Sequence, residues 1–114
     1  MIKLNAILGG LVLAACSSGS QLPANYAPAQ TAIGAADAVG ARNEPRAALH
    51  LKMARDAVVR AQALSKEGDE KEAELMLERA RTDAELALMV TREATARREA
   101  TNAKRELEGL PRAN

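Results

Sequence analysis

The sequence predicts an all-α protein. We expect an antiparallel helical hairpin with a short N-terminal third helix, which together form a small three-helix bundle with a long last helix. Three observations lead to this prediction. Apolar residues recur at steps of three and four through most of residues 49–94. The helix-breaking pair Gly68-Asp69 divides this pattern in two. After that break, a seam made mostly of alanine keeps a 3.5-residue spacing for more than twenty residues.

The first two helices are bounded by residues that start and end helices. Residues 28–39 form the short first helix, with Pro28 in its first turn and Gly40 just past its end. The second helix begins at Asn43-Glu44-Pro45, where Asn43 can cap it, and runs to Lys66. Its apolar positions share one face of the helix: Leu49, Leu51, Met53, Ala54, Ala57, Val58, Ala61 and Leu64.

The third helix is predicted over residues 70–106. A connection as short as Gly68-Asp69 forces it to run antiparallel to the second helix. Alanine lets two helix backbones approach closely along the seam, whose members are Ala73, Leu77, Ala80, Ala84, Ala87, Thr91 and Ala94. A second stripe of Leu86, Met89 and Val90 widens the apolar surface, and we expect the first helix to dock there. Beyond Val90 the pattern ends, so the last turns are either covered by the first helix or project as a solvated rod.

The N-terminus has the pattern of a secretory signal. Lys3 precedes an apolar run over residues 4–13 that is too short to span a membrane, and small residues follow it. The stretch Leu13-Ala14-Ala15-Cys16 resembles the lipobox of bacterial lipoproteins. The resemblance implies cleavage between Ala15 and Cys16, a diacylglycerol on the Cys16 sulfur and an acyl chain on its new amino group.

The predicted domains follow from these elements. Residues 1–15 are the lipoprotein signal peptide, and residues 16–27, rich in Ser, Gly and Pro, are a lipidated flexible tether. Residues 28–108 are the helical domain, and residues 109–114 are a disordered tail. Tyr26 offers an alternative to a fully flexible tether, because its ring can fold back onto the helices.

Composition argues against several functions. Loss of Lys3 with the signal leaves 15 basic and 15 acidic side chains, which gives no field to attract nucleic acid. Tyr26 is the only aromatic residue, so base stacking has little support. His50 is the only histidine, and no carboxylate stands three or four residues from it. We therefore expect no enzyme, no metal and no cofactor beyond the covalent lipid.

The last helix carries the candidate binding surface. It combines the apolar stripe with a basic cluster, and its residues are Leu86, Met89, Val90, Arg92, Arg97 and Arg98. Lys104 and Arg105 extend the cluster toward the C-terminus. The functional interpretation is a contact site for anionic lipid, for lipopolysaccharide or for a partner protein. The alternative is a solvated helix in which Glu93, Glu99 and Glu106 balance the charge.

The chain resembles a named family. The resemblance lies in Ala38-Val39-Gly40-Ala41, Glu44-Pro45, the spaced alanines after Leu51, Gly68-Asp69, and Asp83-Ala84. These elements are similar to the domain-of-unknown-function family DUF4398. The resemblance implies a short, Ala-rich helical lipoprotein of a Gram-negative bacterium. In such lipoproteins, a residue other than Asp after the Cys, here Ser17, implies sorting to the outer membrane.

Two functions remain open from the sequence. The leading expectation is a non-enzymatic outer-membrane lipoprotein, held on the periplasmic face, whose hairpin scaffolds or binds another envelope component or a second copy of itself. The alternative is a small-ligand or substrate-binding module that uses an apolar groove between helices. A cavity lined by Leu86, Met89 and Val90 would favour the alternative, whereas an exposed apolar strip without a cavity would favour the scaffold.

Overall fold

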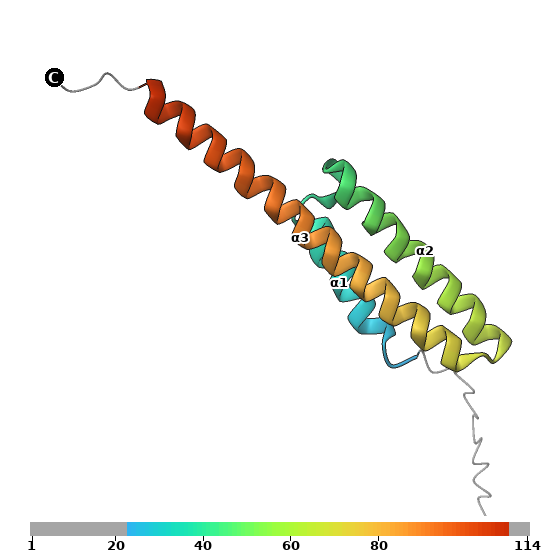
Figure 1. The fold of residues 1–114 in the computed structure, drawn as a ribbon. Coiled ribbons are helices and arrows are strands. Elements are labelled where there is room, and N and C mark those ends of the chain that lie inside the picture. The colour runs from blue at the N-terminus through green and yellow to red at the C-terminus, as the bar shows by residue number, and fades with distance from the viewer. Residues whose placement is uncertain (1–22, 110–114) are drawn as a thin grey trace, which may run out of the picture.

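A computed structural model describes residues 23–109 and confirms the predicted fold class (Figure 1). The helices are α1 (Tyr26–Ala38), α2 (Pro45–Glu67) and α3 (Glu70–Gly109), with a 3₁₀ turn over Ala41–Asn43 between the first two. The described residues contain no strand. The predicted signal peptide, Ala15, Cys16, the tether up to residue 22 and residues 110–114 lie outside the described residues.

The folded domain begins earlier than the sequence predicted. α1 starts at Tyr26 rather than Pro28, and the Tyr26 backbone N–H donates to the Pro23 carbonyl at 2.9 Å. The backbone N–H of Ala24 donates to a carboxylate oxygen of Glu74 at 2.8 Å. Residues 23–27 therefore belong to the domain, and the tether predicted through residue 27 is too long. The alternative in which Tyr26 folds back onto the helices is confirmed, because its side chain packs against the core.

Two glycines in the left-handed backbone region end α1 and α2. Gly40 follows α1 with φ of 83° and donates its N–H to the Asp37 carbonyl at 2.9 Å. Asn43 does not cap α2 as predicted. It lies in the 3₁₀ turn, so Glu44 occupies the cap position and Pro45 begins the helix.

The hairpin turn follows the prediction closely. Gly68 has φ of 86° and ends α2, and the Asp69 N–H donates to the Leu64 carbonyl at 2.9 Å. This pair of features satisfies carbonyl groups that the end of a helix leaves unpaired. α3 then begins at Glu70, and its first half runs antiparallel to α2, as Figure 1 shows.

The predicted seam of α3 forms the centre of the core. Ala73, Leu77, Ala80, Ala84, Ala87 and Thr91 are buried, whereas Ala94 is half-buried. The Thr91 hydroxyl donates to the Ala87 carbonyl at 2.8 Å, which satisfies its polar group inside the helix. Leu77 and Leu51 are the largest fully buried side chains among the described residues. Small residues elsewhere bring the helices close together.

One face of α2 was assigned too broadly. Leu51, Ala54, Val58 and Ala61 are buried as predicted, but 58% of Leu49 is exposed. Leu49 and Leu51 lie about 200° apart around a helix, so both cannot face one neighbour. α1 and α3 both pack against α2, and the buried position Leu51 marks the side of α2 that faces the core.

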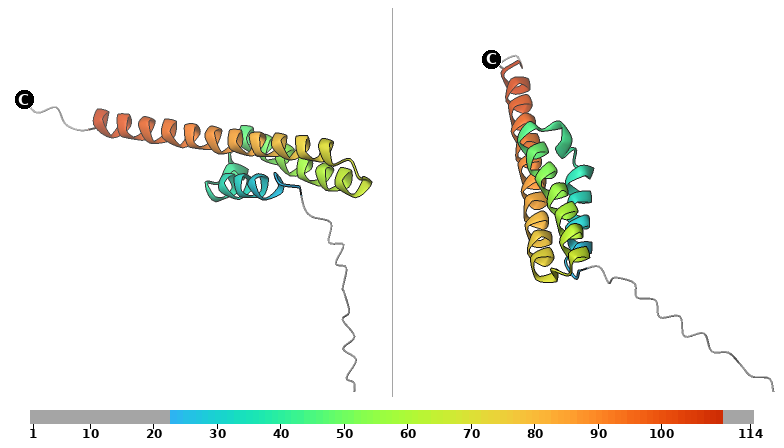
Figure 2. Two further views of the ribbon diagram at one scale, coloured as in Figure 1. Left: turned by 90° about the horizontal axis from the view of Figure 1, so that it is seen from below. Right: turned by 90° about the vertical axis from the view of Figure 1, so that its right-hand side faces the viewer.

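The second half of α3 stands alone. Apart from half-buried Ala94, every residue from 92 to 109 is exposed. We call residues 92–109 the rod. The left view of Figure 2 shows α3 continuing past the other helices in this region. The predicted solvated rod is therefore the arrangement that forms, and the helix extends three residues beyond the predicted end at residue 106.

Candidate interaction surface

The structure separates the predicted apolar stripe into two environments. Leu86 and Met89 are 43% and 59% exposed, whereas Val90 is 8% exposed and belongs to the core. The prediction that α1 docks on this stripe is wrong for Leu86 and Met89, because both remain open to solvent. Val90 in turn is not available to a partner. A contiguous surface for binding therefore includes Leu86 and Met89 but not Val90.

The basic cluster lies at the base and middle of the rod. Arg97 pairs with Glu93 at 2.6 Å, one turn away on the same helix. Arg98 lies 3.6 Å from Glu44, the residue that precedes α2. Arg98 therefore ties the base of the rod to the three-helix body, while Arg92 is exposed beside it. Arg97, Arg98 and Arg105 also line a shallow hollow with Thr101 and Asn102.

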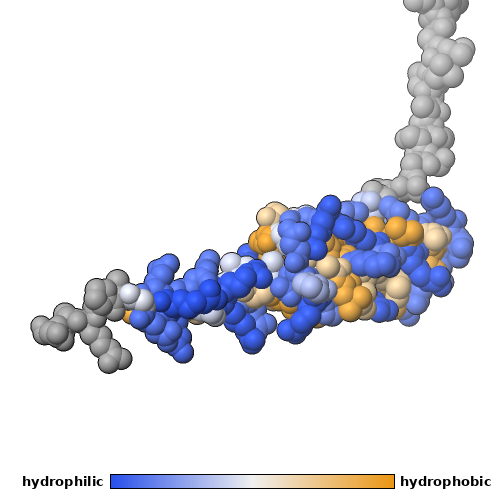
Figure 3. Space-filling model, turned by 90° about the horizontal axis from the view of Figure 1, so that it is seen from above, coloured by the Kyte–Doolittle hydropathy of each residue, from blue (hydrophilic) through white to orange (hydrophobic). Residues whose placement is uncertain are grey.

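Figure 3 shows the same division on the surface. Hydrophobic side chains appear on the three-helix body, between charged ones, whereas the projecting rod is largely hydrophilic on the face shown. The alternating charges of the rod favour its solvation as a single helix. Pairs four residues apart contribute about 0.2–0.5 kcal/mol each, and Lys104 with Glu108 at 3.8 Å is a second such pair.

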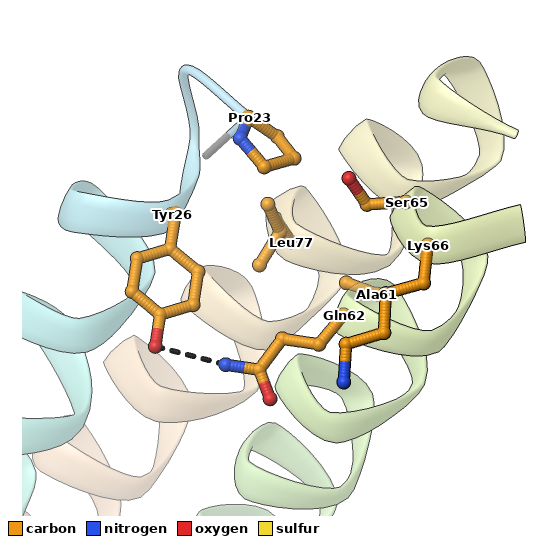
Figure 4. A pocket seen from close by; sticks show the side chains of 7 residues that line it. All are labelled: Pro23, Tyr26, Ala61, Gln62, Ser65, Lys66 and Leu77. Carbon is orange, nitrogen blue, oxygen red and sulfur yellow. Dashed lines mark hydrogen bonds between the residues drawn. The ribbon is translucent and has the colours of Figure 1, made fainter. Parts of the chain in front are cut away.

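A small cavity lies at the other end of the molecule, between α1, α2 and α3 (Figure 4). Its volume is about 220 Å³. The Tyr26 hydroxyl accepts a hydrogen bond from the Gln62 amide at 3.0 Å beside it. The lining residues are Pro23, Tyr26, Ala61, Gln62, Ser65, Lys66 and Leu77. Sequence reasoning missed this cavity because residues 23–26 were assigned to the tether.

A histidine–aspartate pair spans the hairpin. The Nδ1 atom of His50 on α2 lies 3.5 Å from a carboxylate oxygen of Asp83 on α3, and Arg79 lies 3.7 Å from the other oxygen. Sequence spacing missed the pair because Asp83 is distant in the chain. No group of three His, Cys, Asp or Glu side chains within residues 23–109 is placed to hold a metal ion. Two side chains alone fall short of the usual ligand number for zinc.

A carboxylate also links α1 to the turn and to α2. Asp37 accepts a hydrogen bond from Arg42 at 2.7 Å and pairs with Arg55 on α2. The hydrogen bond from Arg42 lowers the pKa of Asp37 despite the opposing effect of partial burial, and Arg55 lowers it further. Asp37 likewise raises the pKa of Arg42. This cluster therefore links α1, the 3₁₀ turn and α2 through one carboxylate.

These features define a class: a small all-α domain in which a helical hairpin and a third helix support a projecting charged rod. The family model described as domain of unknown function DUF4398 matches residues 24–103. The chain belongs to this family, and the match begins where the folded domain begins. No curated protein and no solved structure matches the chain. Within the described residues, no helix is both long and apolar enough to cross a membrane.

Proposed function

We propose that the chain is a non-enzymatic outer-membrane lipoprotein that presents the rod to another envelope component. In this proposal, Cys16 carries a diacylglycerol and an N-acyl chain, and the domain lies on the periplasmic face. No other cofactor is needed. The observation that carries the proposal is the position of the two ends. The first residues of the domain contact the start of α3, whereas the rod projects from the opposite end of the domain.

The entry point is fixed at the start of α3. Ala24 and Asn25 both contact Glu74, the latter through its amide nitrogen at 2.5 Å. Gly109 lies thirty-five residues further along the same helix, which corresponds to about 53 Å. Cys16 precedes Pro23 by seven residues, a reach of at most about 25 Å. The rod is therefore held at the far end of the domain from the anchor.

The form of the rod supports a role in binding or spacing. A helix that is polar around most of its circumference is typical of a solvent-exposed bridge between components. Leu86, Met89 and the exposed Arg92 add a mixed apolar and basic surface at its base. Such a combination suits a protein partner, because binding surfaces are enriched in Met and Arg.

The alternative of a small-ligand module is favoured by one observation, the cavity beside Tyr26. The cavity is not lined by Leu86, Met89 or Val90, where the sequence led us to expect it. At about 220 Å³, it is smaller than the pockets of roughly 300–1,000 Å³ that typically hold drug-sized ligands. It therefore suits at most a small apolar group, and the scaffold remains the better-supported proposal.

Lipidation is tested by metabolic labelling with palmitate. The unaltered chain should incorporate label and fractionate with outer membranes after a high-salt wash. Two or three acyl chains give stable attachment, at about 0.8 kcal/mol for each buried methylene. Cys16→Ser should abolish labelling, while the matched neighbour Ser18→Ala should label normally. Membrane association of Cys16→Ser together with an unlabelled parent chain would contradict the anchor.

The binding role needs a separate test. A photo-crosslinking residue placed at Met89 should capture a defined component in intact cells. The same group at Arg60, an exposed position on α2 away from the rod, is the control. Equal capture at both positions would argue against the rod and its base as the binding surface.

A further inference from the structure

A line of mostly apolar residues, different from the predicted stripe of Leu86, Met89 and Val90, runs along the exposed side of α3 from the body into the rod. Its members are Leu86, Met89, Glu93, Ala96, Ala100, Ala103 and Leu107. We call this set the outer stripe. Every member is exposed, and Leu107 is 70% exposed. All except Glu93 are apolar, although the surrounding rod is highly charged. Regularly spaced apolar residues that face solvent on a charged helix indicate a surface that another molecule can cover.

The spacing of the outer stripe indicates a helical partner. Successive members alternate steps of three and four, which is the 3.5-residue repeat of a coiled-coil seam. The inner seam that α2 covers does not continue in this way. Its next positions beyond Ala94 are Arg98, Thr101 and Arg105. The apolar face of α3 thus changes sides beyond the N-terminal end of α2, where Arg98 lies beside Glu44. The outer stripe is therefore not a remnant of the hairpin seam.

Charge complementarity points to a second copy of the chain in antiparallel orientation. Residues 92–98 carry three Arg and one Glu, a net charge of +2. Residues 99–109 carry three Glu against Lys104 and Arg105, a net charge of −1. Parallel rods would place the basic segment beside its own copy. In the antiparallel register proposed below, Glu93 of each chain lies near Lys104 of the other, and Arg92 lies near Glu106. Parallel rods would instead place Glu93 beside Glu93, so charge favours the antiparallel orientation.

We propose that α3 pairs with α3 of a second copy through the outer stripe, in antiparallel orientation, about a two-fold axis between Ala96 and Ala100. This register places Ala96 against Ala100 of the second copy. It also places Met89 against Leu107 of the second copy, so the two most exposed large side chains of the stripe cover each other. Glu93 then lies near Lys104 of the second copy, where an ion pair offsets its position in the stripe. Alanine at the axis lets the two helices approach closely.

The predicted contact is short and mostly alanine, so we expect weak association in dilute solution. Confinement to a membrane raises the effective concentration of the two rods. This part of the inference rests on the proposed lipid anchor, whereas the geometry of the pair rests on α3 alone. Full-length protein in native membranes is therefore the appropriate sample.

Cysteine crosslinking tests the pair. Cys16 is the only cysteine of the chain, and its thiol is blocked in the lipidated form, so an introduced cysteine supplies the free thiol. Two differently tagged chains are co-expressed, one with Ala96→Cys and one with Ala100→Cys, and the membranes are treated with a mild oxidant. We expect a mixed disulfide between the two tags. Its yield should exceed that of the control pair Thr95→Cys with Thr101→Cys by about ten-fold.

The control pair is matched to the register. Thr95 and Thr101 are exposed, and their midpoint along α3 is that of Ala96 and Ala100, but they lie off the outer stripe. A second pair, Met89→Cys with Leu107→Cys, reports orientation and should give the mixed disulfide. Disulfides joining two Met89→Cys chains instead would indicate parallel rods and overturn the proposal. Equal yields from the stripe and control pairs, or none from either, would overturn it as well.

The parent chain distinguishes failure of this inference from failure of the anchor. Under the same oxidant, the parent should form no disulfide because the Cys16 sulfur carries the diacylglycerol through a thioether bond. A disulfide dimer of the parent would show a free Cys16 thiol and contradict the anchor. The crosslinks along the outer stripe, measured in Cys16→Ser chains at high protein concentration, would still decide whether the rods pair.

Discussion

The Tyr26 hydroxyl lies 3.0 Å from the Gln62 amide nitrogen and accepts its hydrogen bond, which joins the first turn of α1 to the last third of α2. The same ring packs against the core and forms one wall of the cavity that Leu77 also lines. α1 therefore begins at the one aromatic side chain of the protein. Because the Tyr26 ring packs against the core, the folded domain begins before Pro28 and thus nearer to Cys16, the predicted lipid anchor, than the sequence indicated.

Removing the Tyr26 hydroxyl should have a small effect, and removing the ring a larger one. Tyr26→Phe deletes one hydrogen bond and should lower the free energy of unfolding by about 0.5–1.5 kcal/mol. Tyr26→Ala also removes apolar burial and should cost about 2–4 kcal/mol for a half-buried ring. Urea unfolding of a soluble chain starting at Gln21 measures both. Equal stability of the parent and Tyr26→Ala chains would show that α1 does not depend on the ring.

The alanine seam should reject larger side chains. Ala80 and Ala84 are fully buried against the neighbouring helices, so leucine at either position must push the backbones apart. We expect a loss of about 1–3 kcal/mol in unfolding free energy. Leucine at Ala96 or Ala100, both exposed on the rod, should change stability little in dilute solution. Equal melting shifts at all four sites would contradict the register of α3.

Acid should weaken the cluster around Asp37. Its pKa is lowered in the folded protein, first by the hydrogen bond from Arg42 and also by Arg55. A lowered folded-state pKa adds stability above the unfolded-state pKa of about 4 and loses it as the pH falls through the folded value. Because Asp37 is partly exposed, we expect less than about 1 kcal/mol. Asp37→Asn should flatten the stability curve below about pH 4, as followed by thermal melts. An unchanged curve would assign the acid sensitivity to other groups.

Removing most of the rod should leave the three-helix body intact. A chain that ends after residue 98 keeps Arg98 and its contact with Glu44. Since the residues beyond it are all exposed, the unfolding free energy should change by less than about 0.5 kcal/mol at low protein concentration. The same chain should lose the partner captured from position 89 if that partner contacts the rod. A loss of several kcal/mol would show that the rod contributes to folding of the body.

Spacing in the sequence predicted the helical hairpin well, because both of its rules are local. Gly68 can adopt the left-handed conformation whatever surrounds it, and alanines at steps of four and three share one side of any helix. The seam from Ala73 to Thr91 was therefore correct residue by residue. The early end of the apolar pattern left two arrangements open for the last turns of α3, and the tertiary structure decided for the projecting rod.

The lipidation prediction at Ala15 and Cys16 rests on the same kind of local pattern. Those residues lie outside the part of the chain that the structure describes, so the anchor remains a proposal that the labelling experiment tests. The charge of the rod could likewise be counted from the sequence, but the sequence did not identify a partner for the rod.

Contacts between distant segments were decided only by the tertiary structure. Leu49 and Leu51 both fit an apolar helix face, and only the positions of α1 and α3 determine that Leu51 is buried and Leu49 exposed. In the same way, Val90 is buried and its neighbour Met89 is exposed, although both fit the predicted apolar stripe. Tyr26 begins a helix because α2 and α3 together offer it a place to pack, and His50 meets Asp83 because the hairpin aligns them. Spacing along the chain places residues around a helix axis, but burial depends on which side of that helix another helix occupies.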